Sequence, residues 1–393
     1  MTKRATSEAS NGLAKRQAKP PKAWKVEPSD FSKLCANPIR KIVDGIKKPA
    51  NSSKMLIPLS LGALNARSLI CFCRVGWDRS MKHNGYIHSA GSEAARAAIA
   101  QHYGSKRAPL TMDDIIVGSG CSGAIEIALR GLLNPGDNIL LPKPGFPLYQ
   151  AICEAHQIQC KFYNLMDEIY GDMVFGGNAF FPMATLTKTV PVVAVGGLAK
   201  QFLIPGWRVG WVMVHDRSDI LKDVRAAYFK LSQNILGANS LVQSSIPDLL
   251  TPVPGSAEER SLAAFKKRYF ATLEENCKFT IDALSKIPGL KVVVPQGAMY
   301  AMVRHLLPLM GVFGCLNSHK FARCLQVQVQ TDILTQIKDD FDLTQKLLDE
   351  ESVFVLPGQC FGMTNYFRIV FSAPREVLDD AYTRLAGFCE RHQ

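Results

Sequence analysis

The chain has 393 residues, of which 47% are hydrophobic, and its 46 lysines and arginines outnumber its 34 aspartates and glutamates. This length and apolar content predict a large buried core and two domains, since single cores stop growing at about 250–300 residues, and they exclude a disordered protein. The eleven cysteines are scattered and form no Cys-x-x-Cys pattern. That argues against a disulfide framework or a metal site and for a reducing compartment.

The first 30 residues form a basic, polar segment. Seven lysines and arginines precede residue 27, with Glu8 as the only acid, and we predict a disordered tail over residues 1–30. Because this tail carries part of the excess positive charge, no nucleic-acid partner is expected. A mitochondrial transit peptide is the alternative, although Pro20 and Pro21 argue against the amphipathic helix of such peptides. No apolar run reaches the roughly 18 residues of a membrane span, and we expect a cytoplasmic protein.

Residues 31–62 are predicted to be the N-terminal part of a small domain, because an amphipathic stretch at 37–48 leads into an apolar strand at 55–61. A larger domain over residues 63–285 follows. Its short apolar runs and helical stretches alternate at 115–117, 125–133, 139–141, 149–155, 190–195 and 209–214. This βαβ rhythm predicts an α/β fold with a mostly parallel sheet and helices on both faces.

A long helix is expected after Ser256, its N-cap, because apolar residues recur at helical spacing from Leu262 to Leu284. Beyond it, strands and helices alternate again at 291–294, 341–348, 353–356, 367–371 and 375–391. They predict a smaller α+β domain over residues 286–393. Within this domain, residues 306–332 are apolar and cysteine-containing, and we interpret them as an insertion.

Four short motifs of the larger domain could carry chemistry, although each alone is a weak signal. Residues 117–124, VGSGCSGA, predict a turn between a strand and a helix, a geometry that can bind phosphate. The others are DEIY at 167–170, GGLAK ending in Lys200, and PGWRVG with Arg208 at the start of a strand. Taken singly, they are most simply an ordinary turn, a polar strand end and solvated charges.

Their order and spacing indicate one site for a phosphorylated aldehyde cofactor. Such a group needs an amine to attach it, a cation with backbone donors for its phosphate, an acid at its ring nitrogen and a donor to its ring oxygen. Residues 117–124, which we call the phosphate turn, could supply these groups together with Lys200 and Arg208. Asp167 and Tyr170 lie between them in the sequence. The chain therefore resembles the fold-type-I, class-I/II aminotransferases, which depend on pyridoxal 5'-phosphate.

Within that family the chain resembles the tyrosine aminotransferases, through strings that run in order from residue 37 to the C-terminus. They are NPIRKIVDGIK, NGY, SGCSGAIEIAL, LPKPGFPLY, DEIYGDMVF, GGLAK, PGWRVGW, KLSQNILG, GAMY and VLPGQCF. The resemblance implies a large cofactor-binding domain, a small domain and a homodimer. It also implies transfer of the amino group of L-tyrosine and related aromatic amino acids to 2-oxoglutarate, giving 4-hydroxyphenylpyruvate and glutamate in amino-acid catabolism.

The resemblance implies catalytic roles for three residues of this sequence. Lys200 would hold the cofactor and then carry a proton as a free amine. Asp167 would keep the ring nitrogen protonated, and Tyr170 would donate a hydrogen bond to the ring oxygen. Phe146, in the string PGFPLY, would stack on the ring.

The remaining site residues are implied in the same way. The phosphate would be held by Arg208, Gly120, Cys121 and Ser122. Arg368, which lies among apolar strand residues in FRIVF, would clamp the substrate carboxylate, and Gly62 would line the substrate entry. Tyr86 would reach the phosphate of the neighbouring subunit.

The sequence departs from the family pattern just before the DEIY motif. The family carries a long stretch there with an Asn-Pro-x-Asn-Pro-x-Gly motif, whereas here Leu165 is followed directly by Met166 and Asp167. About 60 residues, or two strand–helix units, are therefore missing between 165 and 166. We expect an incomplete central sheet, an unsupported cofactor ring and a displaced Asp167. The alternatives to a transaminase are a non-catalytic splice or gene-model variant and a related lyase that uses the same cofactor.

Overall fold

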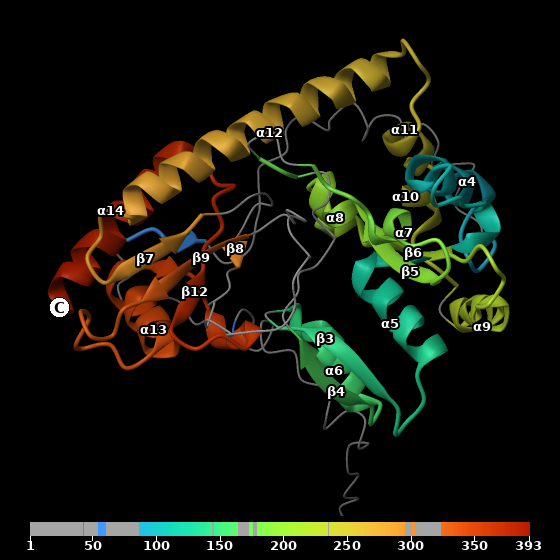
Figure 1. The fold of residues 1–393 in the computed structure, drawn as a ribbon. Coiled ribbons are helices and arrows are strands. Elements are labelled where there is room, and N and C mark those ends of the chain that lie inside the picture. Colours follow the sequence, from blue (N-terminus) through green and yellow to red (C-terminus); the bar gives the residue numbers. More distant parts are fainter. Residues whose placement is uncertain are drawn as a thin grey trace, which may run out of the picture.

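The structure is a computed structural model. The described residues are 42, 54–59, 86–143, 145–163, 173–175, 179–234, 236–294, 301–302 and 324–393. They form two lobes connected by one long helix, α12 (Ala257–Leu284), which runs along the upper side of both lobes in Figure 1.

The helix α12 begins where the sequence predicts it. The Ser256 hydroxyl accepts a hydrogen bond from the Glu259 amide at 3.1 Å, and the Glu259 carboxylate accepts one from the Gly255 amide at 2.6 Å. These contacts satisfy backbone donors that the first turn leaves unpaired. One side of α12 is buried along its length, through Leu262, Phe265, Tyr269, Leu273, Cys277 and Leu284. The helix therefore belongs to the core of both lobes.

The larger lobe contains a three-stranded sheet in the order β2 (Ile115–Ser119), β6 (Val209–His215) and β5 (Val192–Gly197). The strand β6 is antiparallel to both neighbours, so this sheet differs from the mostly parallel sheet expected. The reason is the connection from β5 to β6, which is too short for the crossover that a parallel neighbour needs. The strands β2 and β5 nevertheless run in the same direction.

A second sheet of this lobe pairs β3 (Asn138–Pro142) with β4 (Gln159–Tyr163) in parallel. Among the described residues, this sheet and the three-stranded sheet share no strand pairing. Figure 1 shows the β3–β4 unit below β5 and β6, with α5 (Gly120–Leu132) beside it.

Helices cover both faces of the three-stranded sheet, as expected for an α/β fold. On one face, Ile115, Val117 and Trp211 pack in a cluster with α4 (Glu93–Tyr103). On the other face, Ile116, Val212 and Val214 pack against α5 and α9 (Lys222–Gln233). The remaining helical segments of the lobe are η3 (Met112–Asp114), α6 (Pro147–Ala155), α7 (Met183–Leu186), α8 (Leu198–Gln201), η4 (Pro205–Trp207), α10 (Ser240–Gln243) and α11 (Ile246–Leu250).

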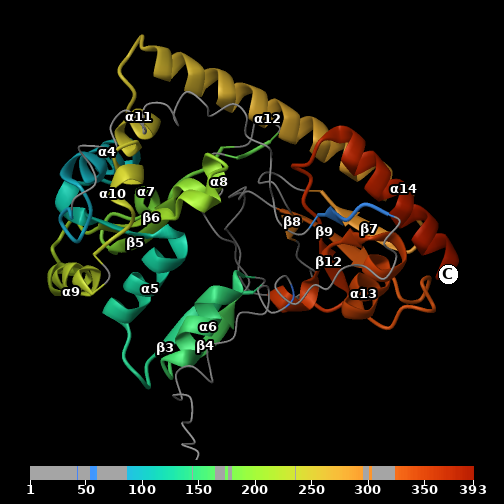
Figure 2. The ribbon, with the colours of Figure 1, turned by 180° about the vertical axis from the view of Figure 1, so that it is seen from behind.

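The smaller lobe has an antiparallel sheet in the order β11 (Leu356–Pro357), β12 (Tyr366–Arg368), β9 (Cys324–Val329) and β7 (Leu290–Val293), with β8 (Ala301–Met302) also paired to β9. Its helical segments are α13 (Asp340–Glu351), η5 (Gly358–Phe361) and α14 (Arg375–Arg391). Seen from behind in Figure 2, α14 lies alongside this sheet. The strand β9 falls within residues 306–332, so the end of the predicted insertion is a sheet strand.

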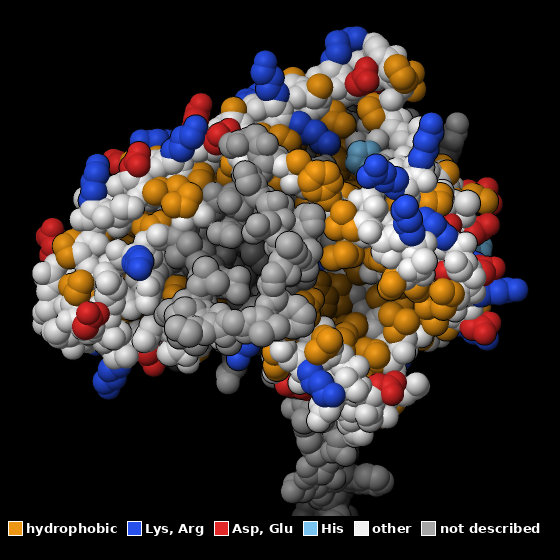
Figure 3. Space-filling view, in the orientation of Figure 1, with side chains coloured by type: hydrophobic (Ala, Val, Ile, Leu, Met, Phe, Trp, Pro, Cys, Tyr) orange, Lys and Arg blue, Asp and Glu red, His pale blue; other side chains and the backbone are white. Residues whose placement is uncertain are grey.

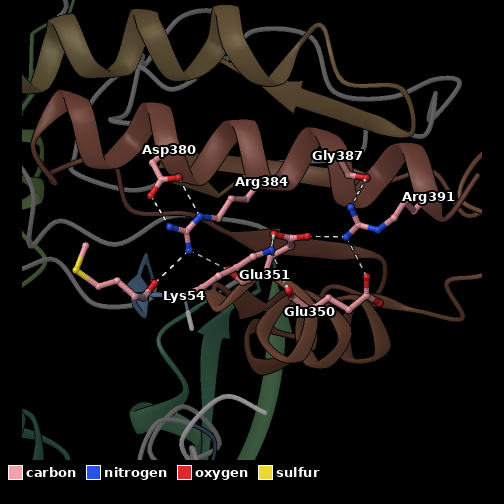
Figure 4. Close-up of polar contacts among 8 residues, drawn as sticks. Lys54, Glu350, Glu351, Asp380, Arg384, Gly387 and Arg391 are labelled. Carbon is pink, nitrogen blue, oxygen red and sulfur yellow. Dashed lines mark hydrogen bonds and ion pairs between the residues drawn. The ribbon is translucent and has the colours of Figure 1, made fainter. Parts of the chain in front are cut away.

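The N-terminal segment joins the smaller lobe through strand β1 (Ile57–Pro58), which pairs in parallel with β10 (Val353–Phe354). Ion pairs support this junction (Figure 4): the buried Glu351 carboxylate contacts Lys54 at 2.5 Å and Arg391 at 2.6 Å. Burial favours the protonated carboxyl, but these hydrogen bonds hold the pKa of Glu351 below its ordinary value. Arg384 adds hydrogen bonds to the carbonyls of Met55 and Glu351.

Candidate functional site

Three motifs that are far apart in the sequence meet at one end of the three-stranded sheet. Gly210 of β6 is the register partner of Gly118 in β2 and of Gly197 in β5, so the three glycines form one row across the sheet. The phosphate turn follows Gly118, Lys200 follows Gly197, and Arg208 precedes Gly210. Strand register therefore brings the phosphate turn, Lys200 and Arg208 to the same end of the three-stranded sheet.

The phosphate turn has the strand–turn–helix geometry that its sequence predicts. The helix α5 starts at Gly120, directly after β2, and the Ser119 side chain makes no capping hydrogen bond to it. The amides of Cys121 and Ser122 lie in the first turn of α5, and the N-cap side chain accepts no hydrogen bond from that turn. A helix N-terminus of this kind favours an anion, through its amides and its dipole.

Arg208 lies against the start of α5. Its carbonyl accepts a hydrogen bond from the Gly120 amide at 2.9 Å, and its Nη1 donates to the Pro205 carbonyl at 3.0 Å. A Cβ on Gly120 would lie only 2.4 Å from Arg208 Nη2, and Gly120 has a φ of +68°, so only glycine fits there. The exposed guanidinium is therefore held at the positive end of a helix, where a bound anion would relieve the repulsion.

Lys200 is half-buried in the short helix α8, immediately after β5. The buried side chains of Leu198 and Phe202 anchor that helix on either side of it. Close packing continues to the phosphate turn, since a Cβ on Gly210 would come within 2.3 Å of the Cys121 amide nitrogen. The structure thus brings Lys200, Arg208, Gly120, Cys121 and Ser122 to one region, as their motifs predict.

Phe146 lies beside the β3–β4 unit of the larger lobe. It precedes α6 and lines a cavity of about 530 Å³ between the β3–β4 unit and η5 of the smaller lobe. The same cavity is lined by Lys143, Phe162 and Phe361, but by neither Lys200 nor Arg208. The Phe146 ring packs edge-on against Tyr149, with 6.1 Å between centroids.

Arg368 is 6% exposed in β12, and its guanidinium lies 4.8 Å from the centre of the Phe361 ring. The segment that carries Phe361 is held by the fully buried carboxylate of Asp340. This carboxylate accepts hydrogen bonds from the amide and side chain of Gln359 at 2.9 Å and from the Asn365 amide at 2.8 Å. Asp340 therefore fixes both ends of the turn that precedes Arg368.

Sequence reasoning missed Asp340 and Phe361. Asp340 follows Asp339, which is the N-cap of α13, so an acid at this point looks like an ordinary helix start. Nearby, burial raises the pKa of the Cys360 thiol to about 11, although the charge of Arg368 acts in the opposite direction. The thiol is protonated at neutral pH and is a packing residue of this turn.

Three predicted site residues lie outside the described residues: Asp167, Tyr170 and Gly62. Tyr86 is described and 94% exposed, so its ring contacts little of its own chain. In the part of the chain that the structure describes, no group of three acidic, histidine or cysteine side chains could hold a metal ion. No helix in that part is long and apolar enough to cross a membrane.

Comparison with known proteins places this geometry in a family. A family model described as aminotransferase class I and II matches residues 77–166 and 161–385. The tyrosine aminotransferase of Dictyostelium discoideum is 38% identical, with 94% of this chain and 97% of that protein covered. The human tyrosine aminotransferase is 34% identical, with 94% and 88% covered. The chain belongs to aminotransferase class I and II, a family of pyridoxal-phosphate-dependent transaminases.

Solved structures confirm the fold class. The crystal structure of a tyrosine aminotransferase from Leishmania infantum matches with a TM-score of 0.79 and 26% identity, covering 94% of this chain and 99% of that one. An alanine aminotransferase from Pyrococcus furiosus matches with a TM-score of 0.76 at 22% identity, covering 93% and 100%. These likenesses extend over both lobes.

Two features of the comparisons concern the continuity of the matches. The family model matches in two pieces that meet at residues 161–166, next to the end of β4 at Tyr163. The alignment with the Dictyostelium protein runs over 435 residues, which is more than the 393 residues of the whole chain. The Dictyostelium protein therefore contains residues that have no counterpart here.

Proposed function

We propose that this chain transfers the amino group of L-tyrosine and related aromatic amino acids to 2-oxoglutarate, giving 4-hydroxyphenylpyruvate and glutamate. The observation that carries the proposal is the similarity to tyrosine aminotransferases over 94% of the chain, at 38% identity for the Dictyostelium protein and 34% for the human one. The cluster at the end of the three-stranded sheet supports the same chemistry, because it combines an amine with an anion site.

The described residues fit the phosphate of pyridoxal 5'-phosphate. A dianion would bind the first-turn amides of α5 and the guanidinium of Arg208, for which Gly120 leaves room by lacking a Cβ. The side chain of Ser122 would add a hydroxyl donor. When bound, this cofactor supplies a conjugated ring that accepts electrons from the substrate Cα.

The chain's own residues then have distinct tasks. Lys200 would hold the cofactor and, as a free amine, move the proton at the substrate Cα. Arg368 would bind the substrate carboxylate, as a bidentate guanidinium does. Asp167 and Tyr170 would act on the ring nitrogen and ring oxygen, Phe146 would stack on the ring, and Gly62 would line the entry. These assignments rest on the family resemblance.

We also propose a homodimer, in which Tyr86 reaches the phosphate site of the partner subunit. The support is the 94% exposure of its side chain, which leaves the ring and hydroxyl available to a partner subunit. Sedimentation of the full chain tests the assembly. A monomer at micromolar concentration would contradict it.

A second candidate is a non-catalytic member of the family. It is favoured by the break in the family match at residues 161–166 and by the separation of the β3–β4 sheet from the three-stranded sheet in the described residues. The position of Phe146, in a cavity lined by neither Lys200 nor Arg208, points the same way. Cofactor binding could survive in such a protein while turnover does not.

Visible absorbance of the purified chain with added pyridoxal phosphate tests the cofactor site. We expect a band from lysine-bound cofactor that is lost in Lys200→Ala and kept in Lys188→Ala, which changes an exposed lysine of the same lobe. Formation of 4-hydroxyphenylpyruvate from tyrosine and 2-oxoglutarate then tests the reaction. A folded chain that gives no product supports the non-catalytic candidate, and absence of the lysine-bound cofactor band contradicts the proposed transaminase.

A further inference from the structure

The cavity beside Phe146 is formed by both lobes. It has a volume of about 530 Å³, and its wall combines residues of β3, α6 and β4 with the η5 segment of the smaller lobe. Figure 1 shows the β3–β4 unit next to the smaller lobe, and Figure 3 shows hydrophobic side chains gathered over this part of the larger lobe. Because small-molecule sites have volumes of about 300–1,000 Å³, the cavity can hold a ligand the size of an amino acid.

Aromatic side chains make up much of this cavity's lining. Phe146, Tyr149, Phe162 and Phe361, which we call the aromatic wall, all line it. Phe361 is buried, and the hydrogen bonds of Asp340 hold the turn that carries it. Phe162 is 45% exposed. Since aromatic rings gain from edge-to-face and offset contacts with further rings, the aromatic wall favours a ligand with a ring of its own.

Lys143 brings a positive charge to the same cavity. Its amide donates a hydrogen bond to the Tyr163 carbonyl at 2.7 Å, which fixes its backbone just after β3. Its stem passes over Gly362 of the smaller lobe, where a Cβ would lie 2.5 Å from the Lys143 Cε. The ammonium lies 5.5 Å from the centre of the Phe162 ring. The charge is therefore held beside the aromatic wall.

Other polar side chains of the lining already have partners. Gln150 donates a hydrogen bond to the Glu154 carboxylate at 2.6 Å, and Gln359 donates one to Asp340 at 2.9 Å. The ion pairs between described residues do not include Lys143, so its ammonium is available to an anion. A single ammonium suits a carboxylate, whereas a phosphate dianion is better matched by the amides and guanidinium at the start of α5.

We propose that this cavity binds a small aromatic carboxylate, whose carboxylate contacts the Lys143 ammonium and whose ring packs against Phe162 and Phe361. This is a binding site only, and it goes beyond the proposed transamination. Because residues of both lobes line the cavity, a bound ligand would connect the lobes and stabilise the folded chain.

Calorimetry with 4-hydroxyphenylacetate tests the site on the full chain saturated with pyridoxal phosphate. This probe has a ring and a carboxylate but no amino or oxo group, so it cannot react with a lysine-bound cofactor. We expect saturable binding, and binding about tenfold weaker for 4-methylphenol, which lacks the carboxylate. Cyclohexylacetate, which lacks the aromatic ring, should bind about threefold more weakly. No binding of the probe, or equal binding of all three compounds, overturns the proposal.

Two lysine variants test the location. Lys143→Met keeps the stem and removes the charge, and should weaken binding of the probe by about tenfold or more. Lys161→Met, which changes an exposed lysine of β4 in the same lobe, should leave binding unchanged. Because both positions are exposed, neither variant should prevent folding. Binding that Lys143→Met leaves unchanged overturns the proposal and points to Arg368 as the carboxylate site.

Competition with the cofactor is the other decisive measurement. If pyridoxal phosphate displaces the probe, the cavity is part of the cofactor site and the proposal is wrong. Failure of the proposed reaction is distinguishable from these results. Probe binding that depends on Lys143, in a chain that forms no 4-hydroxyphenylpyruvate, would leave this site standing and remove the catalytic function.

Discussion

The two lobes of this molecule differ in how completely their sheets are built. In the smaller lobe, β11, β12, β9 and β7 form one continuous sheet, and the ion pairs of Glu351 join the N-terminal segment to it. In the larger lobe, the described strands form two separate sheets around α5. The contrast teaches that the described strands of the larger lobe are held mainly by packing on helices such as α5, whereas those of the smaller lobe are held by continuous strand pairing.

The largest expected effect compares one phenylalanine from each lobe. Phe367 of β12 is fully buried, and Phe367→Ala should lower the free energy of unfolding by about 3–5 kcal/mol. Phe162 of β4 is 45% exposed, and Phe162→Ala should cost less than about 1 kcal/mol. Urea denaturation measures both. Equal losses would mean that β4 is as well packed as β12, and the contrast between the lobes would fail.

Replacement of Asp340 tests how strongly its carboxylate stabilises the turn from Gln359 to Asn365. Asp340→Ala leaves the amides of Gln359 and Asn365 without their acceptor, and should cost roughly 1–3 kcal/mol in the free energy of unfolding. Asp349→Ala, an exposed position on the same helix, is the control and should be neutral. Calorimetry would also measure binding of a substrate-like carboxylate at Arg368. Weaker binding in Asp340→Ala than in Asp349→Ala would show that Asp340 positions the turn before Arg368.

The N-cap of α12 tests the connection between the lobes. Ser256→Ala removes the acceptor of the Glu259 amide and should cost about 1 kcal/mol. Because α12 packs in the core of both lobes, thermal unfolding of both should shift together. A shift confined to one lobe, detected by hydrogen exchange, would show that the lobes unfold independently.

The smallest expected effect concerns pH and Glu351. Its pKa is lowered in the folded chain, so the ion pairs contribute stability above its unfolded pKa of about 4.3, and that contribution disappears as the pH falls through the lowered folded value. Because Lys54 and Arg391 are partly exposed, we expect about 1 kcal/mol or less. Unfolding midpoints measured from pH 6 downward, about the acid range of a carboxyl, should be flatter for Glu351→Gln than for the parent chain.

Much of the fold could be predicted from local pattern. The start of α12 at Ser256 and the strand–turn–helix at Gly120 were predictable because capping and turn chemistry are local. The direction of β6 was not, because the apolar run of a buried strand looks the same in either direction. The strand β9 within residues 306–332 was not predicted, since its sheet partners are distant in the sequence.

The candidate site divides in the same way. Lys200 and Arg208 could be grouped from motif order, and the glycine row across β2, β6 and β5 brings their motifs together. The cavity that Phe146 shares with Phe361 could not be predicted, because it forms between residues that are distant in the sequence. The role of Asp340 depends on a turn that tertiary packing brings to it, which no spacing in the sequence reveals.

The long helix α12 has a mechanical consequence for the molecule. At about 1.5 Å per residue, its 28 residues make a rod of roughly 42 Å. A rod of this length keeps its two ends at a constant separation, and because its buried side belongs to the core of both lobes, it sets the spacing between them. Gly255 and Gly289 let the chain turn where it enters and leaves this rod, with φ of +75° and +82°.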